Sequence, residues 1–115
     1  MKFKSEIKEN ILFIRLEGDL IASPDSQALY NFVEENINES TLLCAIDLSN
    51  VRFINSSGIG VLVSLLTKFR NRGGELILIK PSDHIRKLLI ITKLNAIFTI
   101  AENDTFAAQL LKESI

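Results

Sequence analysis

The chain has 115 residues and a mass of 12.9 kDa, with 47% apolar side chains, 23% charged side chains and a formal net charge of −1. These values are typical of one globular domain with its own hydrophobic core, and they leave no room for a second domain. The near-neutral charge argues against general nucleic-acid binding. One cysteine, Cys44, cannot form an internal disulfide, and one histidine, His84, leaves no plausible set of zinc ligands. We therefore expect a domain without a metal or other cofactor.

The sequence contains no segment typical of a signal peptide or of a membrane span. The first residues contain no apolar stretch of signal-peptide length, and the longest uncharged run, Ile54–Thr67, carries polar residues and glycines. We expect a soluble cytoplasmic protein that does not insert into a membrane.

The first elements are a hairpin and a helix. Alternation over Phe3–Ile7 and the apolar run Ile11–Leu16 predict two strands, with Gly18 ending the second. Ser23-Pro24-Asp25 is typical of a helix start, because it combines a capping hydroxyl, a proline in the first turn and an acidic residue. That helix is predicted to run to about Asn38, with one apolar face formed by Leu29, Phe32, Val33 and Ile37.

The middle of the chain predicts a buried strand and a helix. Leu42–Leu48 is a nearly continuous apolar run, as in a strand that is covered on both faces. Residues 49–54 are expected to form a loop. A helix then opens at Asn55–Gly60 and is ended by Gly73-Gly74. Its apolar face is formed by Leu62, Leu65, Leu66 and Phe69.

The last third repeats the alternation of strand and helix. Glu75–Ile79 predicts a strand, and Pro81-Ser82-Asp83 begins a helix that buries Ile85, Leu88 and Leu89. Ile97–Ile100 is expected to be a short strand. Asp104 is expected to cap a terminal helix that turns Phe106, Leu110 and Leu111 inward. The order of elements predicts an α/β fold with a mixed sheet of four to five strands and helices mostly on one face.

Charge is distributed unevenly along the chain. Residues 17–47 contain seven acidic side chains and no Lys or Arg, whereas residues 68–93 carry a charge of +5. Solvated helix faces explain this distribution most simply. A dipolar surface that orients a charged protein partner is the alternative.

The segment Asn55–Gly60 is the candidate site. Two glycines near a helix start cost roughly 1 kcal/mol each relative to Ala, so close packing on the sheet or a function must offset them. The segment is neither a phosphate-binding loop of the Walker type, since the nearest lysine is Lys68, nor a nucleophile elbow, since no Gly-x-Ser-x-Gly is present. Anion binding at the helix start and phosphorylation of an exposed serine are the functional interpretations that remain.

Four segments together resemble the STAS domain of bacterial anti-sigma factor antagonists. They match in order and spacing over nearly the whole chain, and Gly18-Asp19-Leu20 also resembles the Gly-Glu-Leu that follows the family's second strand. The segments are Ala45–Ser49, Phe53–Val61, Gly73–Leu76 and Leu89–Phe98. The family has Asp where this chain has Asn55, a residue that can still cap the helix.

The resemblance implies a partner-switching protein. Its unphosphorylated form would bind an anti-sigma factor, often a serine kinase of the histidine-kinase-like ATPase class, and a serine phosphatase would reverse phosphorylation. The family's phosphoacceptor corresponds to Ser56, with Ser57 as the neighbouring alternative, and the chain needs no catalytic residues. We expect the loop after Gly18 to join a partner-binding surface of Asn55, Ser56, Ser57, Gly58, Ile59, Gly60, Val61, Ser64 and Lys68. A STAS subunit that docks on a transporter ATPase or permease without phosphorylation is the alternative.

Overall fold

A computed structural model of the chain describes residues 1–114, so the last residue of the predicted domain, Ile115, lies outside the described residues. Five strands form one sheet in the order β1-β2-β3-β4-β5. Strands β1 and β2 are antiparallel, and β2 to β5 are mutually parallel, so the predicted mixed sheet is confirmed. The elements are β1 (Lys2–Lys8), β2 (Ile11–Leu20), α1 (Pro24–Asn36), β3 (Leu43–Ile54), α2 (Ser56–Asn71), β4 (Glu75–Ile79), α3 (Asp83–Ile91), a 3-10 turn (Leu94–Ala96), β5 (Thr99–Ala101) and α4 (Asp104–Glu113).

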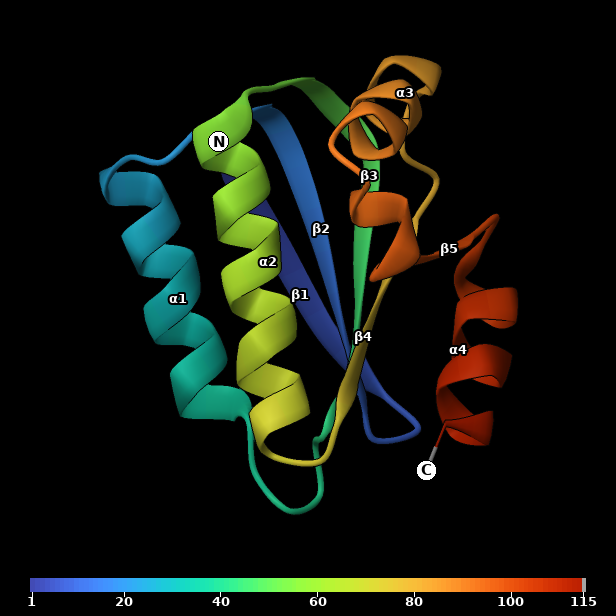
Figure 1. The fold of residues 1–115 in the computed structure, drawn as a ribbon. Coiled ribbons are helices and arrows are strands. Elements are labelled where there is room, and N and C mark those ends of the chain that lie inside the picture. Colours follow the sequence, from blue (N-terminus) through green and yellow to red (C-terminus); the bar gives the residue numbers. More distant parts are fainter. Residues whose placement is uncertain (115) are drawn as a thin grey trace.

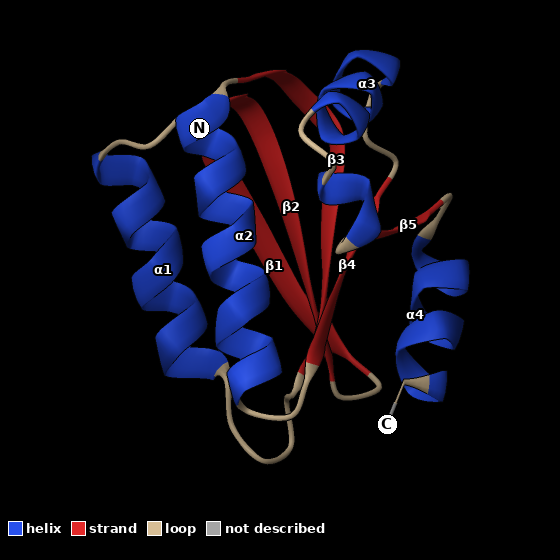
Figure 2. Cartoon of the chain, in the orientation of Figure 1, coloured by secondary structure: helices blue, strands red, loops and turns tan. Residues whose placement is uncertain are grey.

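The helices cover the two faces of the sheet unequally, as predicted. Figures 1 and 2 show α1 and α2 side by side against one face and α4 on the other. The larger core cluster joins α1, α2 and α3 to the side chains on one face of the sheet, with Leu12, Ile14, Cys44 and Ile46 at its centre. The smaller cluster places Ala107 and Leu111 of α4 over Phe13, Ala45 and other residues of the opposite face. Since β3 is buried on both faces, its apolar run is continuous.

Strand β3 is longer than the sequence predicted. The expected loop over residues 49–54 continues the strand to Ile54, and Gly18 lies inside β2 instead of ending it. The two strands stay paired through Leu20 and Ile54 because register shifts between Arg15 and Glu17 and between Gly18 and Asp19 absorb their irregularities. Gly18 has a φ of +96°, a conformation that favours glycine.

The C-terminal elements also differ in detail from the prediction. The last strand is Thr99–Ala101, preceded by the 3-10 turn. Asn103, not Asp104, caps α4 by accepting a hydrogen bond from the amide of Phe106 at 2.8 Å. The side chain of Phe106 is 40% exposed, whereas Ala107 and Leu111 are fully buried. The buried stripe of α4 therefore begins one position later than predicted, where the small Ala107 lets the helix approach the sheet.

Cys44 is a core residue. Its side chain is fully buried, and burial raises the pKa of its thiol well above the usual range. Such a thiol is chemically inert in the folded protein.

Arg15 of β2 connects four elements on the α4 face of the sheet. Its guanidinium donates to Asp104 at 2.6 and 3.1 Å, to Asp47 of β3 at 3.0 Å and to Glu6 of β1 at 2.9 Å. The hydrogen bond from Arg15 lowers the pKa of Asp104, which begins α4. This cluster holds the N-terminal turn of α4 against the sheet.

We expect Arg15→Met to lower the free energy of unfolding by about 1–2 kcal/mol near neutral pH, because three carboxylates lose their shared cation. The folded-state pKa of Asp104 lies below its ordinary value. Its contribution is therefore present above that value and is lost as the pH falls through the folded-state pKa. Urea unfolding of both proteins at about pH 7 and about pH 2.5 measures the difference, which should shrink in acid. Arg52→Met is the control, since Arg52 is 80% exposed and pairs with Asp19 alone. An equal loss in both variants would contradict this role for Arg15.

Candidate functional site

The candidate site is the start of α2, where Asn55 caps the helix. Oδ1 of Asn55 accepts hydrogen bonds from the amide of Gly58 at 2.9 Å and from the hydroxyl of Ser57 at 2.7 Å. Asn55 therefore performs the capping role expected for it without adding a negative charge. No acidic residue lies in the first turn, and the first N–H groups of a helix have no partner within it. The helix start is thus electrostatically suited to a negative group.

Ser56 and Ser57 are both exposed, but their hydroxyls differ in their contacts. Oγ of Ser57 donates to Asn55 and accepts a hydrogen bond from the amide of Ala22 at 3.1 Å, so it links α2 to the loop after β2. Oγ of Ser56 makes no hydrogen bond to any of residues 1–114. Ser56 is therefore the free hydroxyl at this helix start, and Ser57 has a structural role that sequence reasoning missed.

The two glycines of the segment have different environments. A Cβ at Gly58 would lie 1.9 Å from the carbonyl oxygen of Leu20 and 2.9 Å from a side-chain carbon of Ile54. Gly58 therefore lets α2 pack directly on the end of β2. At Gly60 a Cβ would meet nothing within 4 Å, and the residue is exposed. Packing explains the first glycine and leaves the second unexplained.

The structure corrects part of the predicted partner-binding surface. Val61 was expected to face outward, but its side chain is 2% exposed, and Ile59 and Gly58 are buried as well. Val61 lies beside Leu62 and Leu65 in the larger core cluster, because the apolar face of α2 is wide enough to include it. Gly58, Ile59 and Val61 are therefore not available for direct contact with a partner.

The remaining predicted residues lie on one exposed face of α2. Ser56, Gly60 and Ser64 are spaced four residues apart, and this spacing aligns them along the helix. Lys68 continues the row and forms an ion pair with Glu34 of α1. A shallow groove of about 560 Å³ follows the seam between α1 and α2, lined by Gln27, Tyr30, Val63, Ser64, Thr67 and Lys68. Ser64 and Lys68 belong both to this row and to the groove, so the two adjoin along α2.

Two exposed apolar side chains adjoin this helix start. Ile21, in the loop after β2, is 37% exposed, and Phe53, near the end of β3, is 46% exposed. The loop after Gly18 was predicted to belong to the surface, but Phe53 was assigned to a loop without a role. Regular strand alternation would place Phe53 on the same face as the buried Val51, so the local sequence pattern does not predict its exposure.

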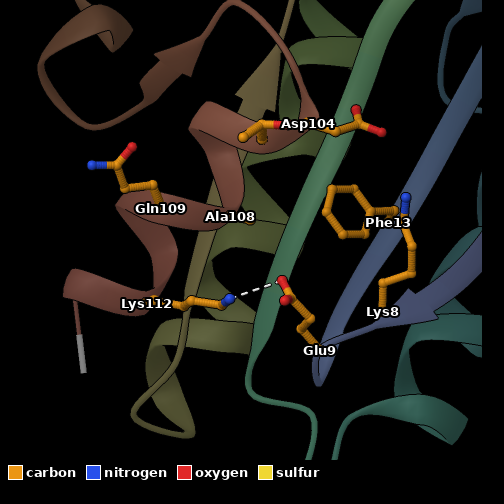
Figure 3. Close-up of a pocket in the computed structure, with 8 residues that line it drawn as sticks. Lys8, Glu9, Phe13, Asp104, Ala108, Gln109 and Lys112 are labelled. Carbon is orange, nitrogen blue, oxygen red and sulfur yellow. Dashed lines mark hydrogen bonds and ion pairs between the residues drawn. The ribbon is translucent and has the colours of Figure 1, made fainter.

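A larger groove lies elsewhere on the molecule. It has a volume of about 840 Å³ and lies between the β1–β2 hairpin and α4, on the sheet face opposite α2. Figure 3 shows Phe13 within it, and an ion pair between Lys112 and Glu9, at 2.8 Å, crosses one end. This groove contains none of the residues predicted for the partner-binding surface.

His84 is exposed on α3, and no group of three His, Cys, Asp or Glu side chains among residues 1–114 could hold a metal ion. The helix start can offer a free hydroxyl and the amides of its first turn.

Comparison with known proteins decides the family. The family model for the STAS domain matches residues 2–110. The chain belongs to the STAS domain family. It is 31% identical to the anti-sigma-B factor antagonist of Listeria monocytogenes over 105 residues, covering 87% of this chain and 90% of that protein. The resemblance to anti-sigma factor antagonists is thereby confirmed.

Solved structures agree on the STAS fold. The anti-sigma factor antagonist SpoIIAA in its unphosphorylated form superposes with a TM-score of 0.80 at 20% identity, covering 97% of each chain. Its phosphorylated form gives 0.74 at 20% identity over 95% of this chain and 99% of that one. A sulfate transporter family protein from Wolinella succinogenes gives 0.78 at 15% identity over 95% and 90%. The same fold therefore occurs in proteins named as anti-sigma factor antagonists and in one named as a sulfate transporter family protein.

Proposed function

We propose that this STAS protein is an anti-sigma factor antagonist that works by partner switching at Ser56. The observation that supports this most directly is the free, exposed hydroxyl of Ser56 at the capped start of α2. The family's phosphoacceptor corresponds to the same residue. The partner would be an anti-sigma factor with serine kinase activity, of the histidine-kinase-like ATPase class, and both proteins would act in the cytoplasm.

The unphosphorylated surface suits close docking of a protein. Ser56, Ser57, Gly60 and Ser64 present small, uncharged groups along α2, and Asn55 and Lys68 mark its two ends. Ile21 and Phe53 add apolar area beside the helix start. A backbone that lacks a Cβ at Gly60 lets a partner approach the helix closely, which gives this exposed glycine a function.

Phosphorylation would reverse this complementarity. The kinase would transfer the terminal phosphoryl group of ATP to Oγ of Ser56, forming the O–P bond as ADP leaves, and a base on the kinase would take the hydroxyl proton. The resulting group carries about −1.5 to −2 charges and is tolerated by the amides of the first turn. The docking surface would become charged and hydrated, and the partner would dissociate until a serine phosphatase removes the phosphate.

Asn55 supports a second candidate function, a STAS subunit that is not phosphorylated, because the carboxylate that a family kinase could recognise is absent. In that case the same surface would dock on a transporter ATPase or permease without phosphorylation. The two functions predict different partners for one surface.

Crosslinking the partner in cells distinguishes the two candidate functions. The protein, carrying a photo-crosslinker in place of Gln27 at the seam of α1 and α2, is expressed in its native cells and irradiated. We expect mass spectrometry to identify an anti-sigma factor crosslinked at this position. The control carries the crosslinker in place of Gln109, in the groove on the opposite face. Transporter subunits crosslinked at position 27, with no anti-sigma factor, would contradict the proposal.

A further inference from the structure

Helix α3 carries the most exposed large apolar side chains of the described residues. Ile85 and Leu89 pack into the core, but Ile90 is 59% exposed and Ile91 is 76% exposed. Two adjacent isoleucines therefore project from a nine-residue helix. In Figure 1, α3 lies at the end of the sheet where α2 begins, on the outside of the molecule. An apolar projection of this kind points to a binding role.

Three lysines without ion pairs lie on α3 or close to its two ends. Lys87 precedes Ile90 and Ile91 by three and four positions and so shares their helix face. Lys80 lies just before the helix and Lys93 just after it. None of the three forms an ion pair with residues 1–114, whereas Lys8, Lys68 and Lys112 all do. Asp83 is the one acidic residue between positions 80 and 93. Four of the seven basic side chains of residues 68–93 thus lie on α3 or close to its ends, namely Lys80, Arg86, Lys87 and Lys93.

We propose that the exposed face of α3 binds the surface of a membrane that contains anionic phospholipids. Ile90 and Ile91 insert among the lipid chains near the headgroups, while Lys80, Lys87 and Lys93 contact the phosphates. A protruding isoleucine pair needs a partner that can form a cavity around it, and a fluid lipid surface does so without a preformed pocket. None of the helices in residues 1–114 is long and apolar enough to cross a bilayer, so this contact is peripheral.

Flotation of the purified chain with vesicles tests the proposal. We expect binding to vesicles of phosphatidylcholine and phosphatidylglycerol, weaker binding as salt rises, and none to phosphatidylcholine alone. Ile90→Ser combined with Ile91→Ser should lower the bound-to-free ratio roughly tenfold or more, as should Lys87→Gln combined with Lys93→Gln. Because all four side chains are exposed, these variants should keep the thermal stability of the parent.

The matched controls are Ile7→Ser and the pair Lys2→Gln with Lys4→Gln. Ile7 is 52% exposed on β1, and neither lysine has an ion pair within the described chain, so these variants change the same groups away from α3. Both controls should bind like the parent. A parent protein that stays unbound would overturn the proposal and assign α3 to a protein partner. Equal losses in the controls, or no loss on removing the isoleucines, would overturn it as well.

Discussion

Gly58→Ala is expected to lower the free energy of unfolding by about 3 kcal/mol or more, the largest stability effect that we predict for a single methyl group in this chain. The added Cβ would lie 1.9 Å from the carbonyl oxygen of Leu20 and 2.8 Å from its carbonyl carbon. Both atoms belong to the backbone at the end of β2, so a rotamer change cannot relieve the clash. Either α2 moves away from the sheet or β2 loses its pairing with β3 at Leu20. Chemical denaturation monitored by circular dichroism measures the loss.

Gly60→Ala is the control, because the same methyl group is added to the same helix two residues later. Its Cβ meets nothing within 4 Å, and replacing glycine inside a helix stabilises it by about 0.5–1 kcal/mol. We expect this variant to be slightly more stable than the parent and to bind the partner less well. A Gly58→Ala protein as stable as the parent would show that α2 does not pack on Leu20 as described.

Ser56→Asp is expected to weaken partner binding roughly 100-fold, equivalent to about 2.7 kcal/mol. The substitution places a charge at the centre of a docking surface that is otherwise small and uncharged, so the partner would have to desolvate it. Because Ser56 is exposed at the first position of α2, an acidic residue there interacts favourably with the helix dipole. The free energy of unfolding should therefore change little. Titration calorimetry with the captured partner measures the affinity.

Two further serine variants separate the effect of charge at Ser56 from the structural role of Ser57. Ser56→Ala should keep the parental affinity, since its hydroxyl has no hydrogen bond within residues 1–114. Ser57→Ala should cost about 1 kcal/mol of stability, because the amide of Ala22 loses its acceptor. If Ser56→Asp bound as tightly as Ser56→Ala, a charge at Ser56 could not be the switch.

The fold could be predicted largely from the sequence because its strongest signals are local. The apolar run before Asp47, the helix start at Pro24 and the glycine pair at position 73 each specify an element by its own composition. The errors occurred where tertiary contacts decide. Residues of β3 after Leu48 look polar and irregular, yet they pair with β2 through Leu20. Phe106 is apolar but exposed, since Ala107 sets the approach of α4.

The start of α2 was predicted correctly from the sequence, but the face that buries Val61 was not. The segment from Asn55 to Gly60 stands out in the sequence because it combines caps and glycines, and the family resemblance selects Ser56. Periodicity alone left Val61 outside, although Val61 lies at one edge of the buried face of α2, which spans somewhat less than half of the circumference of the helix. The bond from Ala22 to Ser57 joins residues 35 positions apart, and no local pattern could have predicted it.

Peptide mapping by mass spectrometry of the protein purified from its native cells, before and after stress, tests partner switching most directly. Our account predicts one phosphate, about 80 Da, on the peptide that contains Ser56 and Ser57, with fragment ions placing it on Ser56 and its occupancy changing with stress. Protein with Ser56→Ala should carry none. A Ser56 that stays unmodified under every condition, while the protein remains bound to its partner, would contradict the account.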